Sequence, residues 1–276
     1  MSKDSSSTDE KIDTPPSVKR GRFGTLVDAI PRVPWNPWLG VAFVIVMYYV
    51  SQILASFLIS IYPTLHHWTN TQANDWLNNS IFAQFCYVAM AEAITLGAIY
   101  VFLKQYRSNF KLIGLKSPQW RDLGYGLLAV PVYYGLYLLT VGLVSHFVPS
   151  LNVNQQQQIG FANAHTAAQL TLTFISLVIL PPLTEEIMVR GFLYSSLKKG
   201  LPTIGAVLVT SALFASAHLP EGGAAGPLYI AALDTFVLSL VLIYLREKTG
   251  SLWASITLHA FKNGVAFMAL FVFMVH

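Results

Sequence analysis

Charged residues and cysteine are both scarce in this chain of 276 residues. Only 11% of its residues are Asp, Glu, Lys or Arg, whereas soluble domains average about 25%. Cys86 is the only cysteine, which excludes an intrachain disulfide and a cysteine-based metal site. Because 54% of the residues are hydrophobic and the mean hydropathy is +0.53, the composition indicates a polytopic membrane protein.

The start of the chain lacks the apolar run of an export signal. Residues 1–17 are polar and rich in Ser, Asp and Lys, so we expect no cleavable signal peptide. We predict two parts: a disordered cytoplasmic tail over 1–34, and a transmembrane bundle over 35–276. The net charge of +4 does not indicate a nucleic-acid partner, because of where the cations lie.

Long apolar segments account for most of the chain, and a membrane span needs about 20 such residues. Seven candidates are present: 38–62, 81–103, 123–148, 169–197, 202–219, 227–245 and 251–275. The fourth contains Pro181-Pro182 and could be a span that runs into a second helix. The predicted fold is therefore an all-α, polytopic transmembrane helix bundle of seven or eight spans. All six tryptophans are close to the segment ends, as interfacial aromatics are: Trp35, Trp38, Trp68, Trp76, Trp120 and Trp253.

Lysine and arginine are absent from every second loop, namely 63–80, 149–168 and 220–226. Fifteen of the 17 lie before the first span or in the other loops. These are Lys3, Lys11, Lys19, Arg20, Arg22, Arg32, Lys104, Arg107, Lys111, Lys116, Arg121, Lys198, Lys199, Arg246 and Lys248. The positive-inside rule then predicts a cytoplasmic N-terminus and an external C-terminus. We expect an integral protein of the cell (plasma) membrane, surrounded by the lipid bilayer.

Ionisable side chains nevertheless occur inside three of the later apolar segments. Each costs about 2.5–3.5 kcal/mol to insert on translocon scales, so such residues are candidates for a functional site. The candidates are the ionisable residues Glu185, Glu186, Arg190, His218 and His259, together with the polar residue Asn263 one turn after His259.

Helical spacing separates the two adjacent glutamates. Glu186 and Arg190 are four residues apart and share a helix face, so we predict a buried structural ion pair. Glu185 points about 100° away and is free to face a cavity, where a carboxylate can act as the general base on water. His218 is the candidate to hold that water or to deliver a proton.

The remaining pair is spaced in the same way. His259 and Asn263 lie one helical turn apart, so both can donate hydrogen bonds to a developing oxyanion. A second interpretation is a zinc site with Glu185, His218 and His259 as ligands. The spacing differs from the soluble H-E-x-x-H pattern, so the zinc interpretation has no independent sequence support.

Two further acids, Glu92 and Asp234, also lie in apolar segments. We expect each to be paired structurally, with Arg190 or Lys262 as the candidate partner.

At the motif positions the chain resembles the CAAX-protease and bacteriocin-processing family of intramembrane proteases, which includes the prenyl-protein endopeptidases. That family carries E-E-x-x-x-R, F-x-x-x-H and H-x-x-x-N/D, in this order, on separate helices. Here the motifs stand as Glu185-Glu186-x-x-x-Arg190, Phe214-x-x-x-His218 and His259-x-x-x-Asn263, with Gly191 after the arginine. The resemblance covers about 123–263.

The resemblance implies an endopeptidase that hydrolyses membrane-associated protein or peptide substrates. It assigns Glu185 and His218 to water activation, and His259 and Asn263 to oxyanion stabilisation. The family is usually filed among metallopeptidases, so a metalloprotease with zinc as cofactor remains open.

Two functions from other classes compete with the protease. One is a non-catalytic scaffold on the same fold, for bacteriocin self-immunity or cell-envelope regulation; a degenerate motif would favour it, and every motif position here is intact. The other is a proton-coupled transporter that uses Glu185, His218 and Asp234 as a relay. Transporters often have repeated halves, and this sequence shows no repeat.

Overall fold

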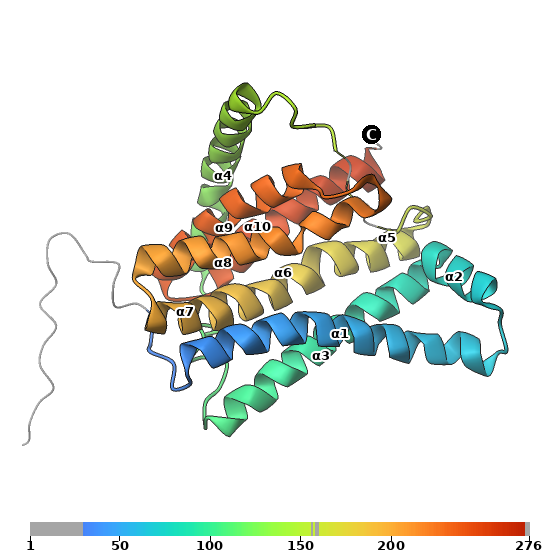
Figure 1. The fold of residues 1–276 in the computed structure, drawn as a ribbon, viewed down its shortest axis with the longest axis horizontal. Coiled ribbons are helices and arrows are strands. Elements are labelled where there is room, and N and C mark those ends of the chain that lie inside the picture. Colours follow the sequence, from blue (N-terminus) through green and yellow to red (C-terminus); the bar gives the residue numbers. More distant parts are fainter. Residues whose placement is uncertain (1–29, 156, 158–159, 274–276) are drawn as a thin grey trace, which may run out of the picture.

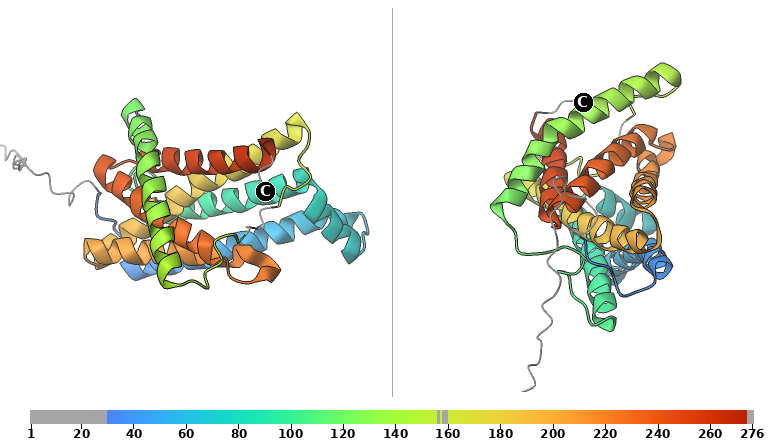
Figure 2. Two further views of the ribbon diagram at one scale, coloured as in Figure 1. Left: turned by 90° about the horizontal axis from the view of Figure 1, so that it is seen from above. Right: turned by 90° about the vertical axis from the view of Figure 1, so that its left-hand side faces the viewer.

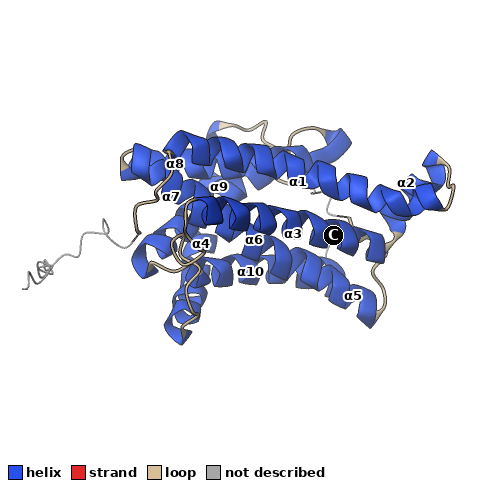
Figure 3. Ribbon diagram, turned by 90° about the horizontal axis from the view of Figure 1, so that it is seen from below, coloured by secondary structure: helices blue, strands red, loops and turns tan. Residues whose placement is uncertain are grey.

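A computed structural model describes residues 30–155, 157 and 160–273. All regular secondary structure in these residues is helical (Figure 3). Seven helices are long and apolar enough to cross a membrane: Pro37–Leu65, Ile81–Gln105, Trp120–Phe147, Ala167–Gly200, Thr203–Gly223, Tyr229–Thr249 and Trp253–Val272. The predicted all-α bundle is confirmed, and the described residues contain seven candidate spans rather than eight.

The first three spans are single helices, α1 (Pro37–Leu65), α3 (Ile81–Gln105) and α4 (Trp120–Phe147). A short polar helix, α2 (Asn70–Asn79), joins α1 to α3. It begins with a capping box in which Thr69 and Gln72 each bond the other's backbone N–H, and this satisfies two N–H groups that the helix would leave free.

The fourth span is a composite helix made of five consecutive pieces. These are α5 (Ala167–Phe174), the π-helical η2 (Ile175–Ile179), α6 (Leu180–Glu185), the π-helical η3 (Glu186–Leu193) and α7 (Tyr194–Gly200). Proline in a helix removes a backbone hydrogen bond and clashes with the preceding turn. Here the wide turn of η2 directly before Pro181-Pro182 absorbs that misfit, so the helix continues instead of breaking.

The last three spans are α8 (Thr203–Ala217) with the 3₁₀ turn η4 (Leu219–Ala225), α9 (Tyr229–Thr249), and α10 (Trp253–Phe267) with the π-helical η5 (Met268–Val272). Gly250 ends α9 in the left-handed conformation, with φ of 64°, which glycine adopts without strain.

The composite helix lies in the middle of the bundle. Figure 1 shows α1 and α3 on one side of it and α8, α9 and α10 on the other. Half of its most apolar window is buried inside the protein, against 11% for α4. Both views in Figure 2 show α4 crossing steeply over the bundle, where it packs on α9 and α10. Among the candidate spans, only α9 is buried to a similar extent, at 56%, so residues on the composite helix are held firmly by protein contacts.

Trp35 corrects one expectation from the sequence. It is only 1% exposed, stacks on Phe192 with ring centroids 4.8 Å apart, and donates a hydrogen bond to Ser196 Oγ at 2.8 Å. Trp35 is therefore a core residue and not an interfacial one, because its indole finds both an aromatic partner and an acceptor inside the bundle. Ile30 and Val33 are buried in the same core, whereas residues 1–29 of the expected tail lie outside the described part of the chain.

Candidate active site

Glu186 is the centre of a buried polar cluster. Its Oε1 accepts hydrogen bonds from Arg190 Nη1 at 2.9 Å and from His259 Nδ1 at 3.0 Å. The side chains of Glu186 and Arg190 are both fully buried. One carboxylate thus joins η3 to α10, and the charge of Arg190 compensates it inside the membrane span.

The contacts of Phe214 explain why the motif has a phenylalanine four residues before His218. Its ring lies under the guanidinium of Arg190, 4.2 Å from Cζ, and its centroid is 4.7 Å from the ring of His218. Its backbone carbonyl accepts a hydrogen bond from His218 Nδ1 at 2.8 Å. One residue of α8 therefore positions both the ion pair and the first histidine.

Gly191 permits a close approach on the other side of η3. A Cβ at this position would lie 3.1 Å from the Ile113 carbonyl oxygen and 3.2 Å from a Leu252 methyl, closer than side chains normally pack. The glycine after Arg190 thus lets the segment before α4 and the start of α10 sit against the motif helix.

The two histidines present the same ring nitrogen. In each, Nδ1 carries the proton, because its partner is an acceptor: Glu186 for His259 and the Phe214 carbonyl for His218. The assignment follows from the hydrogen-bond partners. Nε2 is then the nitrogen without a proton in both rings. In His259 it lies 3.8 Å from Glu185 Oε2, and in His218 it lies 3.9 Å from Glu221 Oε1.

Glu185 and Glu186 occupy different surroundings. The Glu185 side chain is 27% exposed, whereas Glu186 is 0% exposed. Glu185 Oε2 has no hydrogen-bond partner among the described residues. Glu92, Glu186 and Glu221 all lie within electrostatic range of Glu185, so the carboxylate that is free to react is surrounded by acids and histidines.

A cavity of about 470 Å³ opens beside these groups, between α1, η3, α8 and η4, and we call it the central cavity. Glu185 and His218 line it together with Tyr48, Gln52 and Glu221. The sequence analysis missed these last three. Glu221 had a visible signal, as the only ionisable residue in the loop 220–226. Tyr48 and Gln52 lie in a uniformly apolar span and gave none.

Asn263 is turned toward the composite helix. Its Nδ2 donates a hydrogen bond to the Leu177 carbonyl of η2 at 3.0 Å, and neither Asn263 nor His259 lines the central cavity. The structure therefore brings five of the six candidates into contact around Glu186 and the cavity wall. It holds Asn263 one turn beyond His259, with one N–H still available.

The acids Glu92 and Asp234 differ from each other. Asp234 Oδ2 is 2.9 Å from Lys262 Nζ, and Oδ1 accepts a hydrogen bond from the Tyr133 hydroxyl, so the predicted pairing of Asp234 with Lys262 is confirmed. The predicted pairing of Glu92 is wrong, because Glu92 is in none of the ion pairs found among the described residues. Arg190 is taken by Glu186, and Glu92 instead lies beside Thr184.

The donor set does not fit a metal as it stands. Among the described residues no three His, Cys, Asp or Glu side chains converge closely enough to hold an ion. Both histidines donate Nδ1–H to an acceptor, as metal-binding histidines commonly do. Glu185 Oε2 and His259 Nε2 are 3.8 Å apart, which is compatible with two ligands that each lie about 2.0–2.2 Å from one zinc ion, but the third candidate, His218, does not complete a group with them. The chemistry below is therefore derived from the side chains alone, and the zinc content is left to direct measurement.

Fold and site together define an integral membrane protein with a partly exposed carboxylate and two histidines among its spans. Residues 167–265 match the family described as Type II CAAX prenyl endopeptidase Rce1-like. The match contains all three motifs and confirms the resemblance of this part of the chain to the CAAX-protease family. It supports endopeptidase activity on membrane-associated protein in general. No curated protein and no solved structure matches the chain.

Proposed function

We propose that this protein is an intramembrane endopeptidase in which Glu185 and His218 activate the water that hydrolyses the peptide bond. The observation that carries the proposal is the setting of Glu185. Its Oε2 accepts no hydrogen bond from the described residues, lies 3.8 Å from His259 Nε2 and belongs to a side chain on the wall of the central cavity. A carboxylate in that position is available as a general base.

The reaction needs only water and the peptide. Glu185 takes a proton from water, the hydroxide oxygen bonds to the carbonyl carbon, and the carbon–nitrogen bond breaks as the proton passes to the leaving nitrogen. His218 presents Nε2 to the cavity because Phe214 holds its Nδ1, so the ring accepts a hydrogen bond from the same water and relays the proton.

His259 and Asn263 are proposed to stabilise the oxyanion. Asn263 retains one N–H after its bond to Leu177. His259 donates from Nε2 only when its ring carries two protons, since Nδ1–H is already committed to Glu186. The role of Glu186 and Arg190 is to position His259, and neither lines the central cavity.

The proposed setting is the plasma membrane, with the N-terminus cytoplasmic and the C-terminus external. The support is the alternation of the cation-free loops with those that carry Lys and Arg, which sets orientation during insertion. Substrates are then membrane-associated proteins or peptides whose scissile bond reaches the level of Glu185.

A comparison of membrane proteomes tests this function. Cells producing the wild-type protein, Glu185→Gln or Asp75→Asn are compared for new protein ends. Glu185→Gln keeps the shape of the side chain but cannot take a proton, whereas Asp75 is exposed on α2 and accepts a hydrogen bond from Asn79. We expect a set of cleavage products shared by wild type and Asp75→Asn and absent from Glu185→Gln. An identical profile in all three would favour the scaffold for immunity or envelope regulation.

A further inference from the structure

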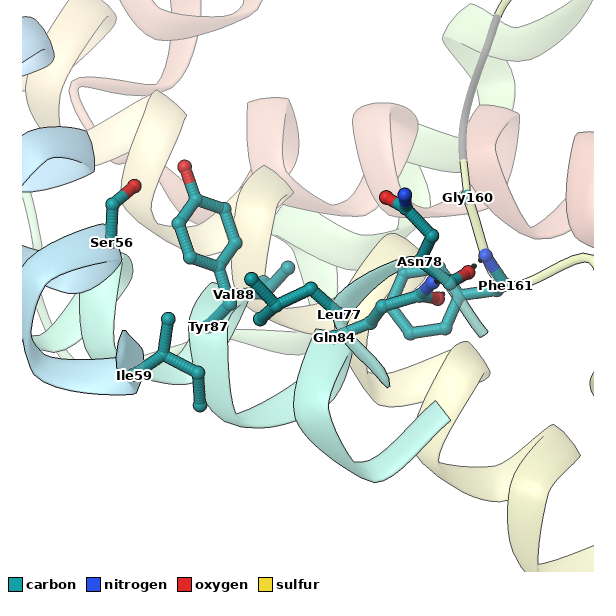
Figure 4. A pocket seen from close by; sticks show the side chains of 9 residues that line it. All are labelled: Ser56, Ile59, Leu77, Asn78, Gln84, Tyr87, Val88, Gly160 and Phe161. Atoms are coloured by element: carbon teal, nitrogen blue, oxygen red, sulfur yellow. Dashed lines mark hydrogen bonds between the residues drawn. The ribbon is translucent and has the colours of Figure 1, made fainter. Parts of the chain in front are cut away.

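A second cavity, of about 400 Å³, lies between α1, α2, α3 and the segment 160–161 (Figure 4), and we call it the end cavity. It is near the end of the bundle at which α2 joins α1 to α3, opposite α7 (Figure 1). None of the residues that line it belongs to the motifs. Its volume lies within the range of about 300–1,000 Å³ that is typical of ligand sites.

One face of α1 connects the end cavity to the central cavity. Tyr48 and Gln52 line the central cavity, and Ser56 and Ile59 line the end cavity. These residues follow one another at intervals of four, four and three, so they lie along a single stripe of the helix. The two cavities are therefore arranged in a row along α1.

One face of α3 also leads from the end cavity toward Glu185. Gln84 and Val88 line the end cavity, and Glu92, one turn further along, lies beside Thr184 and within electrostatic range of Glu185. Two helices thus lead independently from the end cavity to the proposed catalytic carboxylate.

A hydrogen bond joins the lining of one cavity to the lining of the other. The Tyr87 hydroxyl donates to Gln52 Oε1 at 2.5 Å; Tyr87 lines the end cavity and Gln52 the central one. Figure 4 shows the Tyr87 hydroxyl pointing away from the Gln84–Phe161 end, toward the side on which Ser56 lies. Both groups of this bond can exchange it for bonds to a peptide backbone, since Tyr and Gln each donate and accept.

The lining selects the chemistry of the occupant. It contains no charged side chain, but it offers the hydrogen-bonding groups of Ser56, Asn78 and Tyr87 between apolar ones such as Val88. Gln84 is already held at both ends, by the Asn78 carbonyl at 2.6 Å and the Phe161 N–H at 2.7 Å, and it forms a firm wall. An extended peptide needs such partners for its backbone, whereas a lipid chain needs none.

We propose that the end cavity binds uncharged residues of the substrate on one side of the scissile bond, so that the peptide lies extended along α1 from Glu185 past Gln52. This inference rests on the proposed function and names the substrate segment that the site accepts. From Tyr48 to Ile59 the helix rises roughly 17 Å, which corresponds to about five residues of extended chain.

A binding experiment tests the end cavity without relying on hydrolysis. Uncharged synthetic peptides of about four and about eight extended residues, each with a benzophenone at one end, are cross-linked to the full-length Glu185→Gln protein in lipid vesicles. Among the longer peptides, we expect those that carry the label at one particular end, and not those labelled at the other end, to cross-link to residues 77–88. Ser56→Trp should abolish that product, because the larger side chain fills the cavity. Ile53→Trp is the matched control, because Ile53 is 66% exposed on the lipid-facing side of α1. Cross-links that avoid 77–88, or that survive Ser56→Trp, overturn the inference.

The same peptides, internally quenched, separate failure of the inference from failure of the proposed function. In the wild-type background Ser56→Trp should lower kcat/KM for the long peptides by about tenfold or more, which is about 1.4 kcal/mol of binding. Hydrolysis of the short peptides should be unchanged in Ser56→Trp, and hydrolysis of both lengths should be unchanged in Ile53→Trp. Equal loss for long and short peptides overturns the end-cavity assignment. Absence of hydrolysis by wild type, with cross-links at 77–88 intact, overturns the protease function and leaves the peptide-binding site standing.

Discussion

Asn263 donates a hydrogen bond to the Leu177 carbonyl at 3.0 Å, and Leu177 lies four residues before Pro181. In an α-helix that carbonyl would accept from the N–H of residue 181, and in a π turn from residue 182. Both are prolines and have no N–H. The third motif therefore supplies, from α10, the donor that the Pro-Pro pair removes from the composite helix.

The first prediction follows from this replacement. Asn263→Ala should destabilise the protein by about 1–3 kcal/mol, the usual cost of a buried acceptor left unsatisfied, and should lower its thermal unfolding temperature in detergent. Pro181→Ala in the same chain restores an N–H for Leu177, so the double variant should recover stability. If Asn263 also contacts the oxyanion, activity should stay low in that stabilised double variant. No rescue of stability by Pro181→Ala would contradict the structural role of Asn263.

The second prediction concerns the buried ion pair. Arg190→Ala leaves the fully buried Glu186 uncompensated, at a cost of about 3–5 kcal/mol, and it removes the group that holds in place the carboxylate to which His259 donates. We expect a large loss of folded protein in size-exclusion profiles. Glu185→Gln should give wild-type yield, since the Glu185 side chain is partly exposed and its Oε2 accepts no hydrogen bond from the described residues. Equal yields of both variants would argue against the division between the two glutamates.

The helical spans and the main cluster could be read from the sequence, whereas several contacts could not. Hydropathy detects a span but not which side of a uniformly apolar helix meets protein and which meets lipid. For that reason Gln52 and Tyr48 of α1 were missed and Trp35 was misjudged as interfacial. The π turns are a tertiary solution to Pro181-Pro182 that spacing alone does not indicate. The motif residues could be found because a buried ionisable group needs a polar partner, and residues four positions apart share one face of a helix.

The third prediction concerns zinc. Because the three candidate ligands do not converge among the described residues, we expect purified protein to contain much less than one zinc per chain. Activity should persist after treatment with a membrane-impermeant and a permeant chelator. Metal analysis by mass spectrometry on wild type, His218→Ala and His259→Ala checks this. Stoichiometric zinc in wild type that is lost in both variants would establish the metal site instead.

The fourth prediction concerns orientation. A reporter fused after Gly250 should read cytoplasmic, and one fused after Leu151 should read external, since the loop 149–168 carries no lysine or arginine and the positive-inside rule retains charged loops in the cytoplasm. Paired alkaline phosphatase and fluorescent-protein fusions give opposite signals at each site. The reverse pattern at both positions would overturn the proposed topology while leaving the fold intact.

The last prediction concerns catalysis itself. Loss of a general base costs about 10²–10⁴-fold in rate, and loss of one oxyanion donor about 10²–10³-fold. Glu185→Gln should therefore insert and fold like wild type yet cleave almost nothing, and His218→Ala should fall by a comparable factor. Residues that act on one water are not additive, so Glu185→Gln combined with His218→Ala should be little slower than either alone.

Glu221→Gln provides the comparison for these rates. Glu221 lies 3.9 Å from His218 Nε2 but is assigned no step, so its loss should change the rate far less than loss of Glu185. Single-turnover cleavage of a peptide taken from the proteome comparison is measured for the wild type and the four variants. Multiplication of the two single losses in the double variant would mean that Glu185 and His218 serve separate steps. Wild-type cleavage by Glu185→Gln would remove that carboxylate from the mechanism, and Glu221, which lines the same cavity, would then be the next candidate for the base.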